Sequence, residues 1–228
     1  RQVLGQFGEV LDVQAGTIAE VERATWPLAR QRAEVVVDEL QQPADVLLMG
    51  LPRDFHYGPG MGTNPILMSL AIGAQYSRAA RALRPDPVVI AVAACDGWFN
   101  ADWFPSYEPT YEALQGHDTA AAFLASDDAA RISSDPGWCA SYSQGYTYHP
   151  FHAMSMISGG AVPFEWCSQV YLVGAEQPRY ARGMGYRTLP TVEVALQDAE
   201  RYVGANARIL ATPECFSGGM AVNLISAG

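Results

Sequence analysis

The segment 44–84 constrains the fold more than any other part of the chain, because it combines a strand, a glycine-rich loop and a long helix in that order. Residues 45–49 are almost wholly apolar, which is typical of a strand buried in a sheet. The loop 50–63 is rich in Gly, Pro and aromatic residues, and an apolar helix is expected from about Asn64. This order makes half of a β–α–β unit, in which ligands bind at the loop after the strand.

Strands and helices alternate along the chain after this segment. Three further apolar runs are expected to be strands: 88–94, 168–173 and 207–211. An amphipathic helix is expected at 191–203, and an aromatic, irregular stretch at 136–148 before a short helix at 151–158. The alternation predicts a layered α/β/α domain with a mainly parallel sheet of about four core strands.

A connecting segment is expected before this domain. Residues 3–13 are apolar and broken by glycine, which favours a strand or a hairpin. Thr17 and Glu20 have the spacing of a capping box at the start of a helix, and Pro27 is expected to kink or split that helix. We therefore divide the chain into a connecting segment, 1–43, and a C-terminal α/β domain, 44–228. Because the sequence begins at an Arg, we expect that it is cut from a longer protein.

Composition excludes several classes of protein. The chain is 49% hydrophobic and 17% charged, so it can bury a sizeable core. A net charge of −10 argues against a nucleic-acid surface, and no apolar run reaches the ~18 residues of a membrane span. Its four cysteines are far apart, which is typical of reduced thiols in a cytoplasmic protein without a metal site. The chain has no lysine, so it cannot attach a cofactor through one.

The loop before the helix contains the candidates for ligand binding. Gly58, Gly60 and Gly62 alternate there, and their backbone N–H groups could approach an anion. The alternative is a loop whose turns need positive φ angles. In the same loop, Arg53 could bind a carboxylate and His56 could exchange a proton, although a surface Arg and a packed His are equally consistent with the sequence.

Two other groups of residues could carry chemistry. Asp96 follows the strand 88–94 and could contact a ligand hydroxyl. His149 and His152 have the spacing of a metal pair on a helix, but Pro150 between them favours a hydrogen-bonded helix start or packing. A cluster of aromatic residues after the same strand could line a pocket or pack in the core. It consists of Trp98, Phe99, Trp103, Phe104 and Tyr107.

The order of these segments is similar to that of a known family. The similar segments are QFGEVLDVQAG leading into a helix, ADVLLMGLP followed by Asn64, a helix ending in AARAL, VVIAVAACDGW, HPFHAM, SQVYLVGA and TVEVALQDAERYVGANARILATPE. Over nearly its whole length, the chain resembles the C-terminal domain of the nickel-pincer lactate racemase family, which comprises 2-hydroxy-acid racemases and epimerases.

The resemblance implies a two-domain enzyme with its active site between the domains. The missing N-terminal domain would carry the nickel cofactor on a lysine together with the catalytic and metal-binding histidines, and this chain would close over a small hydroxy-acid substrate. Without lysine, this chain is not expected to hold the cofactor or to be active alone, and it contributes neither catalytic nor metal-binding residues. Its partner would be the N-terminal domain, and we also consider a homo-oligomer.

The resemblance also implies where the substrate binds. Arg53, His56, Asn64, Ser69 and Asp96 are the candidate substrate-binding residues. Family members hold the substrate with a Gln and a Lys one turn apart on the helix after the loop. The nearest residues here are about Ser69 and Ile72, so lactate is not the expected substrate. A function of another class stays open, namely a stand-alone module that binds a nucleotide or another phosphorylated ligand at the loop from Gly58 to Gly62.

Overall fold

The computed structural model describes residues 12–54, 58, 60–216 and 222–227, and all structural statements here concern those residues. Their centre is a five-stranded sheet with the order β5-β4-β3-β2-β6, in which every neighbouring pair is parallel. The strands are β2 (Ala44–Gly50), β3 (Leu83–Val92), β4 (Gln169–Val173), β5 (Arg187–Leu189) and β6 (Ile209–Thr212). The four expected core strands are confirmed, and β5 is a fifth, too short and polar to stand out in the sequence.

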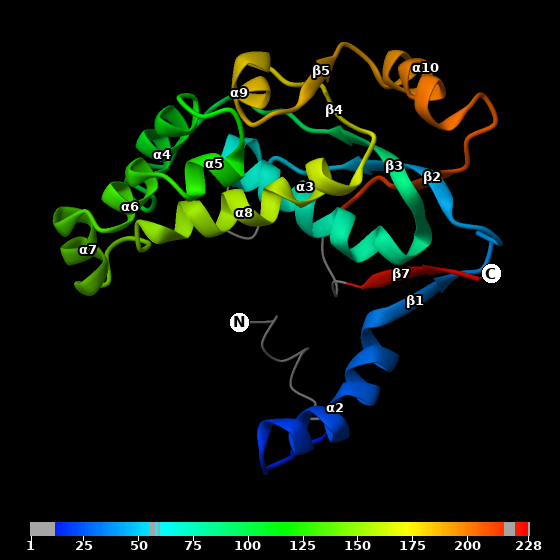
Figure 1. Ribbon diagram of the computed structural model, residues 1–228, viewed down its shortest axis with the longest axis horizontal. Helices are drawn as coiled ribbons and strands as arrows, with labels where there is room; N and C mark the ends of the chain where they lie inside the picture. Colours follow the sequence, from blue (N-terminus) through cyan, green and yellow to red (C-terminus); the bar gives the residue numbers. More distant parts are fainter. Residues whose placement is uncertain (1–11, 55–57, 59, 217–221, 228) are drawn as a thin grey trace.

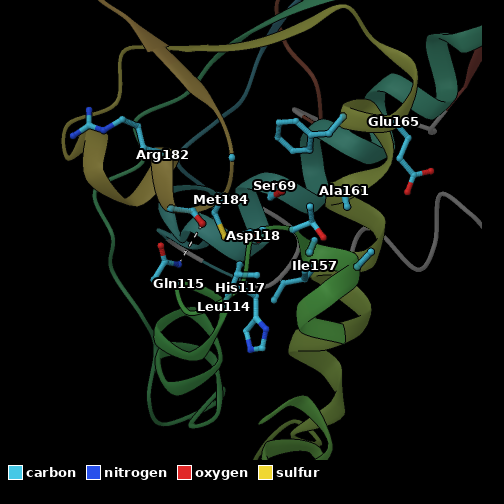
Figure 2. A pocket seen from close by; sticks show the side chains of 16 residues that line it. Ser69, Leu114, Gln115, His117, Asp118, Ile157, Ala161, Glu165, Arg182 and Met184 are labelled. Carbon is cyan, nitrogen blue, oxygen red and sulfur yellow. Dashed lines mark hydrogen bonds between the residues drawn. The ribbon is translucent and has the colours of Figure 1, made fainter. Parts of the chain in front are cut away.

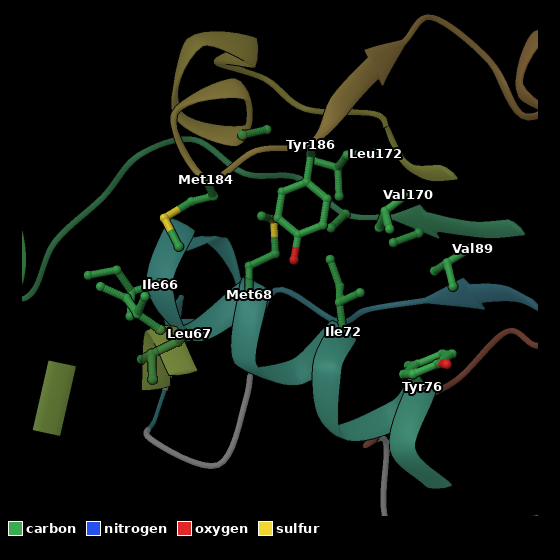
Figure 3. Close-up of a cluster of buried hydrophobic side chains, with 14 of the residues drawn as sticks. Ile66, Leu67, Met68, Ile72, Tyr76, Val89, Val170, Leu172, Met184 and Tyr186 are labelled. Carbon is green, nitrogen blue, oxygen red and sulfur yellow. The ribbon is translucent and has the colours of Figure 1, made fainter. Parts of the chain in front are cut away.

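Helices cover both faces of this sheet, which confirms the layered α/β/α architecture (Figure 1). On one face, α3 (Pro65–Ala79) and α8 (Phe151–Trp166) pack against alternate strand residues such as Leu47 and Val89. On the other face, α10 (Val192–Val203) packs Ala195 and Ala199 against Ile90. Figure 3 shows Met68 and Ile72 of α3 directed toward β4, which carries Val170 and Leu172.

The remaining elements frame the sheet. They are α2 (Ile18–Ala33), β1 (Glu34–Val37), η1 (Met61–Thr63), η2 (Ala80–Ala82), α4 (Tyr107–Leu114), α5 (Ala120–Leu124), α6 (Asp127–Ser133), α7 (Pro136–Ser143), α9 (Pro178–Gly183) and β7 (Asn223–Ser226). None of the helices in this described part is long and apolar enough to cross a membrane.

Two expectations about the helices between β3 and β4 were wrong. The stretch expected to be irregular contains α7, which begins because Asp135 accepts a hydrogen bond from the Trp138 N–H at 2.9 Å and Pro136 suits the first turn. The helix expected at 151–158 continues to Trp166, through two glycines and Pro163. Gly159 and Gly160 lie directly against Leu70 and Ser69 of α3, and the helix continues through them.

The connecting segment begins as its sequence predicts. Thr17 and Glu20 form a complete capping box, and α2 then runs through Pro27 without being split. In Figure 1, α2 extends away from the body of the molecule. The strand or hairpin expected at 3–13 lies almost wholly outside the described residues. The boundary between 43 and 44 stays a prediction, although β1 of the first segment pairs in parallel with β7 near the C-terminus.

A buried carboxylate fixes α10 to the sheet. The Tyr171 hydroxyl donates to Asp198 Oδ2 at 2.6 Å, and Arg187 and Arg201 approach the two carboxylate oxygens at 2.7 and 3.0 Å. The hydrogen bond from Tyr171 and the two guanidinium groups hold the pKa of Asp198 below its ordinary value. The carboxylate therefore stabilises the fold most where it is fully ionised.

We expect this contribution to disappear in acid. Since the folded pKa lies below the unfolded one, the stabilisation is complete above the ordinary carboxyl pKa of about 4 and falls as the pH drops below it. Asp198→Asn keeps an acceptor for Tyr171 but cannot titrate. The variant should be less stable than the wild type at pH 7, and the difference should shrink toward pH 3 when both are unfolded with urea. If the difference in unfolding free energy between the two proteins did not change with pH, the pKa of Asp198 would not be lowered in the folded state.

Candidate functional site

The loops after three neighbouring strands meet at the carboxyl edge of the sheet. Arg53 follows β2, Asp96 follows β3 and Glu176 follows β4. The Arg53 guanidinium donates to the Glu176 carboxylate, and its Nη1 lies 4.0 Å from Asp96 Oδ2. Parallel strands bring their carboxyl ends to one edge, which is where such sheets bind ligands. We call Arg53, Asp96 and Glu176 the edge cluster.

The edge cluster is open to solvent. The side chains of Arg53, Asp96 and Glu176 are 57%, 31% and 49% exposed. Ion pairs this exposed contribute about 1 kcal/mol or less to stability, so they orient Arg53 more than they stabilise the fold. Asp54 also belongs to the Arg53 loop, and the four side chains carry one positive and three negative charges. This balance is unfavourable for a ligand with several negative charges.

The described glycines of the loop hydrogen-bond within the chain. The Gly60 N–H donates to Asp54 Oδ1 at 2.9 Å, and the Gly62 N–H donates to the Arg53 carbonyl at 2.8 Å. Gly58 and Gly60 have φ angles of 114° and 73°, in the region that favours glycine. A Cβ on Gly62 would lie 2.0 Å from the Pro52 carbonyl oxygen. The turn itself thus explains these glycines, and an anion site at their N–H groups stays a prediction.

Asn64 closes the first turn of α3. Its Oδ1 accepts from the N–H groups of Ile66 and Leu67 at 3.0 and 3.1 Å, and its Nδ2 donates to the Trp98 carbonyl at 3.1 Å. Pro65 has no N–H, and the Met68 N–H donates to the Asn64 carbonyl. The N–H groups of the first helical turn therefore already have acceptors within the chain. Without these acceptors, the same N–H groups could bind an anion.

Replacing Asn64 should therefore destabilise the protein. We expect Asn64→Ala to lower the free energy of unfolding by about 1–2 kcal/mol, since both the helix cap and the bond to the Trp98 loop are lost. Asn64→Asp keeps the accepting oxygen and loses only the donor, so it should cost clearly less. Urea unfolding of both variants tests this. If both variants lost the same free energy of unfolding, the helix cap made by Asn64 would not be the cause of the destabilisation.

Two tryptophans stand beside the glycine loop. Trp98 and Trp103 are 44% and 49% exposed. Their rings approach Gly60 and Gly58, where a Cβ would lie 3.3 and 3.6 Å from the nearest ring atom. Asp96 Oδ1 accepts a hydrogen bond from the backbone N–H of Trp98 at 2.9 Å, which links the edge cluster to this aromatic surface. The aromatic cluster thus divides between surface and core, since Phe104 and Tyr107 are buried.

The other predicted substrate-binding residues have different environments. Ser69 does not join the edge cluster, because it is 1% exposed and its hydroxyl accepts from the Tyr186 hydroxyl at 2.9 Å in the core. His56 lies outside the described residues. Sequence reasoning missed Glu176, although the loop after the strand 168–173 lies at the carboxyl edge and Glu176 is its first acidic residue.

The two histidines at the start of α8 have separate partners. His149 Nδ1 accepts from the Phe151 N–H at 3.0 Å, which confirms the hydrogen-bonded helix start. His152 Nδ1 lies 2.8 Å from the Tyr107 hydroxyl, and burial lowers the pKa of His152. In the described part of the chain, no group of three or more His, Cys, Asp or Glu residues is arranged to hold a metal ion.

Comparison with known proteins finds similarity to solved structures and none to sequences. No protein family model and no curated protein matches the chain. The chain is similar to the lactate racemase apoprotein from Thermoanaerobacterium thermosaccharolyticum, with 15% sequence identity and a TM-score of 0.47. The match covers 91% of this chain and 40% of that chain. A similarity of this size concerns the fold alone and assigns no activity.

Proposed function

We propose that this chain is the substrate-closing domain of a lactate-racemase-like 2-hydroxy-acid racemase or epimerase. The chemistry would take place on a second, cofactor-bearing domain outside these 228 residues. This chain would supply the surface that covers the substrate and excludes water from it. The proposal depends on the order of the sequence segments that resemble this family, and on the geometry of the edge cluster.

The observation that carries the proposal is the position of Arg53. Its guanidinium is held by Glu176 and Asp96 from two neighbouring loops, at the edge where parallel sheets bind ligands, and it remains more than half exposed. An arginine held in this way can turn one side of its fork to a substrate carboxylate while the acidic residues keep its orientation. The acidic residues can accept hydrogen bonds from substrate hydroxyl groups.

The residues of this chain do not fit the nickel cofactor itself. The family attaches it through a lysine, which this sequence lacks, and the described residues include no group of three or more His, Cys, Asp or Glu arranged to hold a metal ion. We propose that the cofactor and the groups that move the proton at C2 of the substrate belong to the partner domain. No step of the reaction is assigned to this chain beyond binding and orienting the substrate.

The geometry supports this function better than nucleotide binding. A nucleotide phosphate would need free N–H groups in the glycine loop or at the start of α3. Those of Gly60, Gly62, Ile66 and Leu67 already have acceptors within the chain. The three carboxylates around Arg53 would also repel a phosphate.

The test compares this chain with the longer protein that carries it. The longer protein, loaded with the nickel cofactor, is incubated with a panel of single-enantiomer 2-hydroxy acids, and the products are separated on a chiral column. We expect at least one acid to be racemised or epimerised by the longer protein and none by the 228-residue chain alone. Activity of the isolated chain, or no conversion of any acid by the loaded protein, would contradict the proposal. Calorimetric titration of the isolated chain with nucleotides tests the alternative function, nucleotide binding.

A further inference from the structure

A concave site lies apart from the edge cluster. A pocket of about 580 Å³ is enclosed by the end of α4, the start of α5, the second half of α8 and the turn from α9 to β5 (Figure 2). Its volume falls in the range of small-molecule sites, roughly 300–1,000 Å³. None of the edge-cluster residues lines it, whereas Ser69, a predicted substrate-binding residue outside that cluster, does.

The pocket wall combines apolar and polar side chains. The apolar ones include Leu114, Ala120, Ile157, Ala161, Phe164 and Met184, and Asp118 is among the polar ones. Two charged residues of the wall, Glu165 and Arg182, extend away from the enclosed space on opposite sides in Figure 2. Arg182 donates instead to the Thr188 hydroxyl at 3.3 Å, and His117 lies 3.4 Å from the Asp128 carboxylate. The wall thus offers apolar contact area together with the carboxylate of Asp118.

The wall of the pocket is fixed by backbone packing. Gly183 lies so close to α4 that a Cβ would sit 2.0 Å from the Tyr111 hydroxyl oxygen. Gln115 Nε2 donates to the carbonyls of Gly183 and Tyr111 at 3.2 and 2.8 Å, which joins α4 to the turn after α9. Phe164 packs edge-on against Tyr186 with ring centroids 5.0 Å apart. A pocket held in this way exists before a ligand arrives, which lowers the cost of binding.

We propose that this pocket binds one largely apolar small molecule of about two aromatic rings that carries no negative charge. An anion is disfavoured, because Asp118 and Glu165 line the pocket and the chain carries a net charge of −10. The Asp118 carboxylate lines the pocket and would accept a positive charge on the ligand, so the pocket selects against anions only. This inference is independent of the proposed function.

The test uses two fluorescent probes of similar size and different charge. N-phenyl-1-naphthylamine is neutral, whereas 1-anilinonaphthalene-8-sulfonate is an anion. The 228-residue chain should bind the neutral probe saturably at one site and the anion at least about 10-fold more weakly. Ala161→Trp fills the pocket and should abolish binding of the neutral probe. Ala140→Trp, the same change at an exposed position of α7 that does not line the pocket, should leave binding unchanged.

The possible outcomes separate clearly. Undiminished binding of the neutral probe by folded Ala161→Trp, or no binding by the wild type, overturns the proposal. Equal or tighter binding of the anion overturns the assigned ligand class. If Ala161→Trp does not fold, the methyl resonances of Ile157 and Met184 in the wild type decide the question. Shifts centred on these two methyl-bearing residues upon addition of the neutral probe support the site, and shifts centred elsewhere overturn it.

Discussion

Gly73→Ala should unfold this protein or destabilise it by roughly 3 kcal/mol or more. A Cβ on Gly73 would lie 2.1 Å from the Gly159 carbonyl oxygen of α8. Real Cβ atoms do not approach backbone this closely, so α3 and α8 would have to move apart. The two helices share the largest buried cluster, where α3 residues such as Ile66, Leu67 and Met68 are fully buried. Separating them would open cavities along the whole interface.

Urea unfolding followed by circular dichroism measures this effect, with Gly116→Ala as the control. Gly116 follows α4 in an exposed turn, and the nearest atom to an added Cβ there is the Ala113 carbonyl oxygen at 3.4 Å. The control should stay within about 0.5 kcal/mol of the wild type. If Gly73→Ala were as stable as Gly116→Ala, the α3–α8 packing described here would be wrong.

Arg53→Met should reduce kcat/KM of the cofactor-loaded longer protein by roughly 10- to 100-fold for its 2-hydroxy acid. The change keeps a long aliphatic stem and removes the charged fork that would bind the substrate carboxylate. We expect most of the loss in KM, since the proposed contact is made to the bound substrate as well as in the transition state. The fold should tolerate the change, because the ion pairs of Arg53 are exposed.

The matched control for this variant is Arg131→Met. Arg131 is also an exposed arginine, on α6, and it too pairs with an acidic residue, Asp128. Its replacement should leave kcat and KM unchanged. Equal effects of the two variants would indicate a general charge effect and would remove Arg53 from the proposed site.

The core elements of the fold could be predicted from local sequence because each carries its own pattern. The strand from Ala44 to Gly50 is apolar on both faces, and Thr17 with Glu20 marks a helix start by their spacing alone. The length of α8 could not be predicted in this way. Gly159 and Gly160 are unfavourable for a helix in isolation, and their purpose is visible only when α3 lies against them.

The candidate site was predictable only in part, for a similar reason. Arg53 and Asp96 belong to loops after recognisable strands, so the parallel sheet brings them together. Glu176 completes the edge cluster through a loop whose position depends on strand order, which no local pattern specifies. Ser69 was assigned from its position on the helix after the loop, and its contact with Tyr186, 117 residues further along the chain, depends on the tertiary fold.

The central claim is that the edge cluster of this chain completes a racemase site, and exchange of the C2 hydrogen tests it most directly. The cofactor-loaded longer protein is incubated in D₂O with each 2-hydroxy acid of the panel, and the C2 proton signal is followed by NMR. With the acid kept below its KM, we predict that the signal of at least one acid disappears, at a rate reduced at least about 10-fold by Arg53→Met and unchanged by Arg131→Met. No exchange with any acid, or exchange that is indifferent to Arg53, would contradict the account.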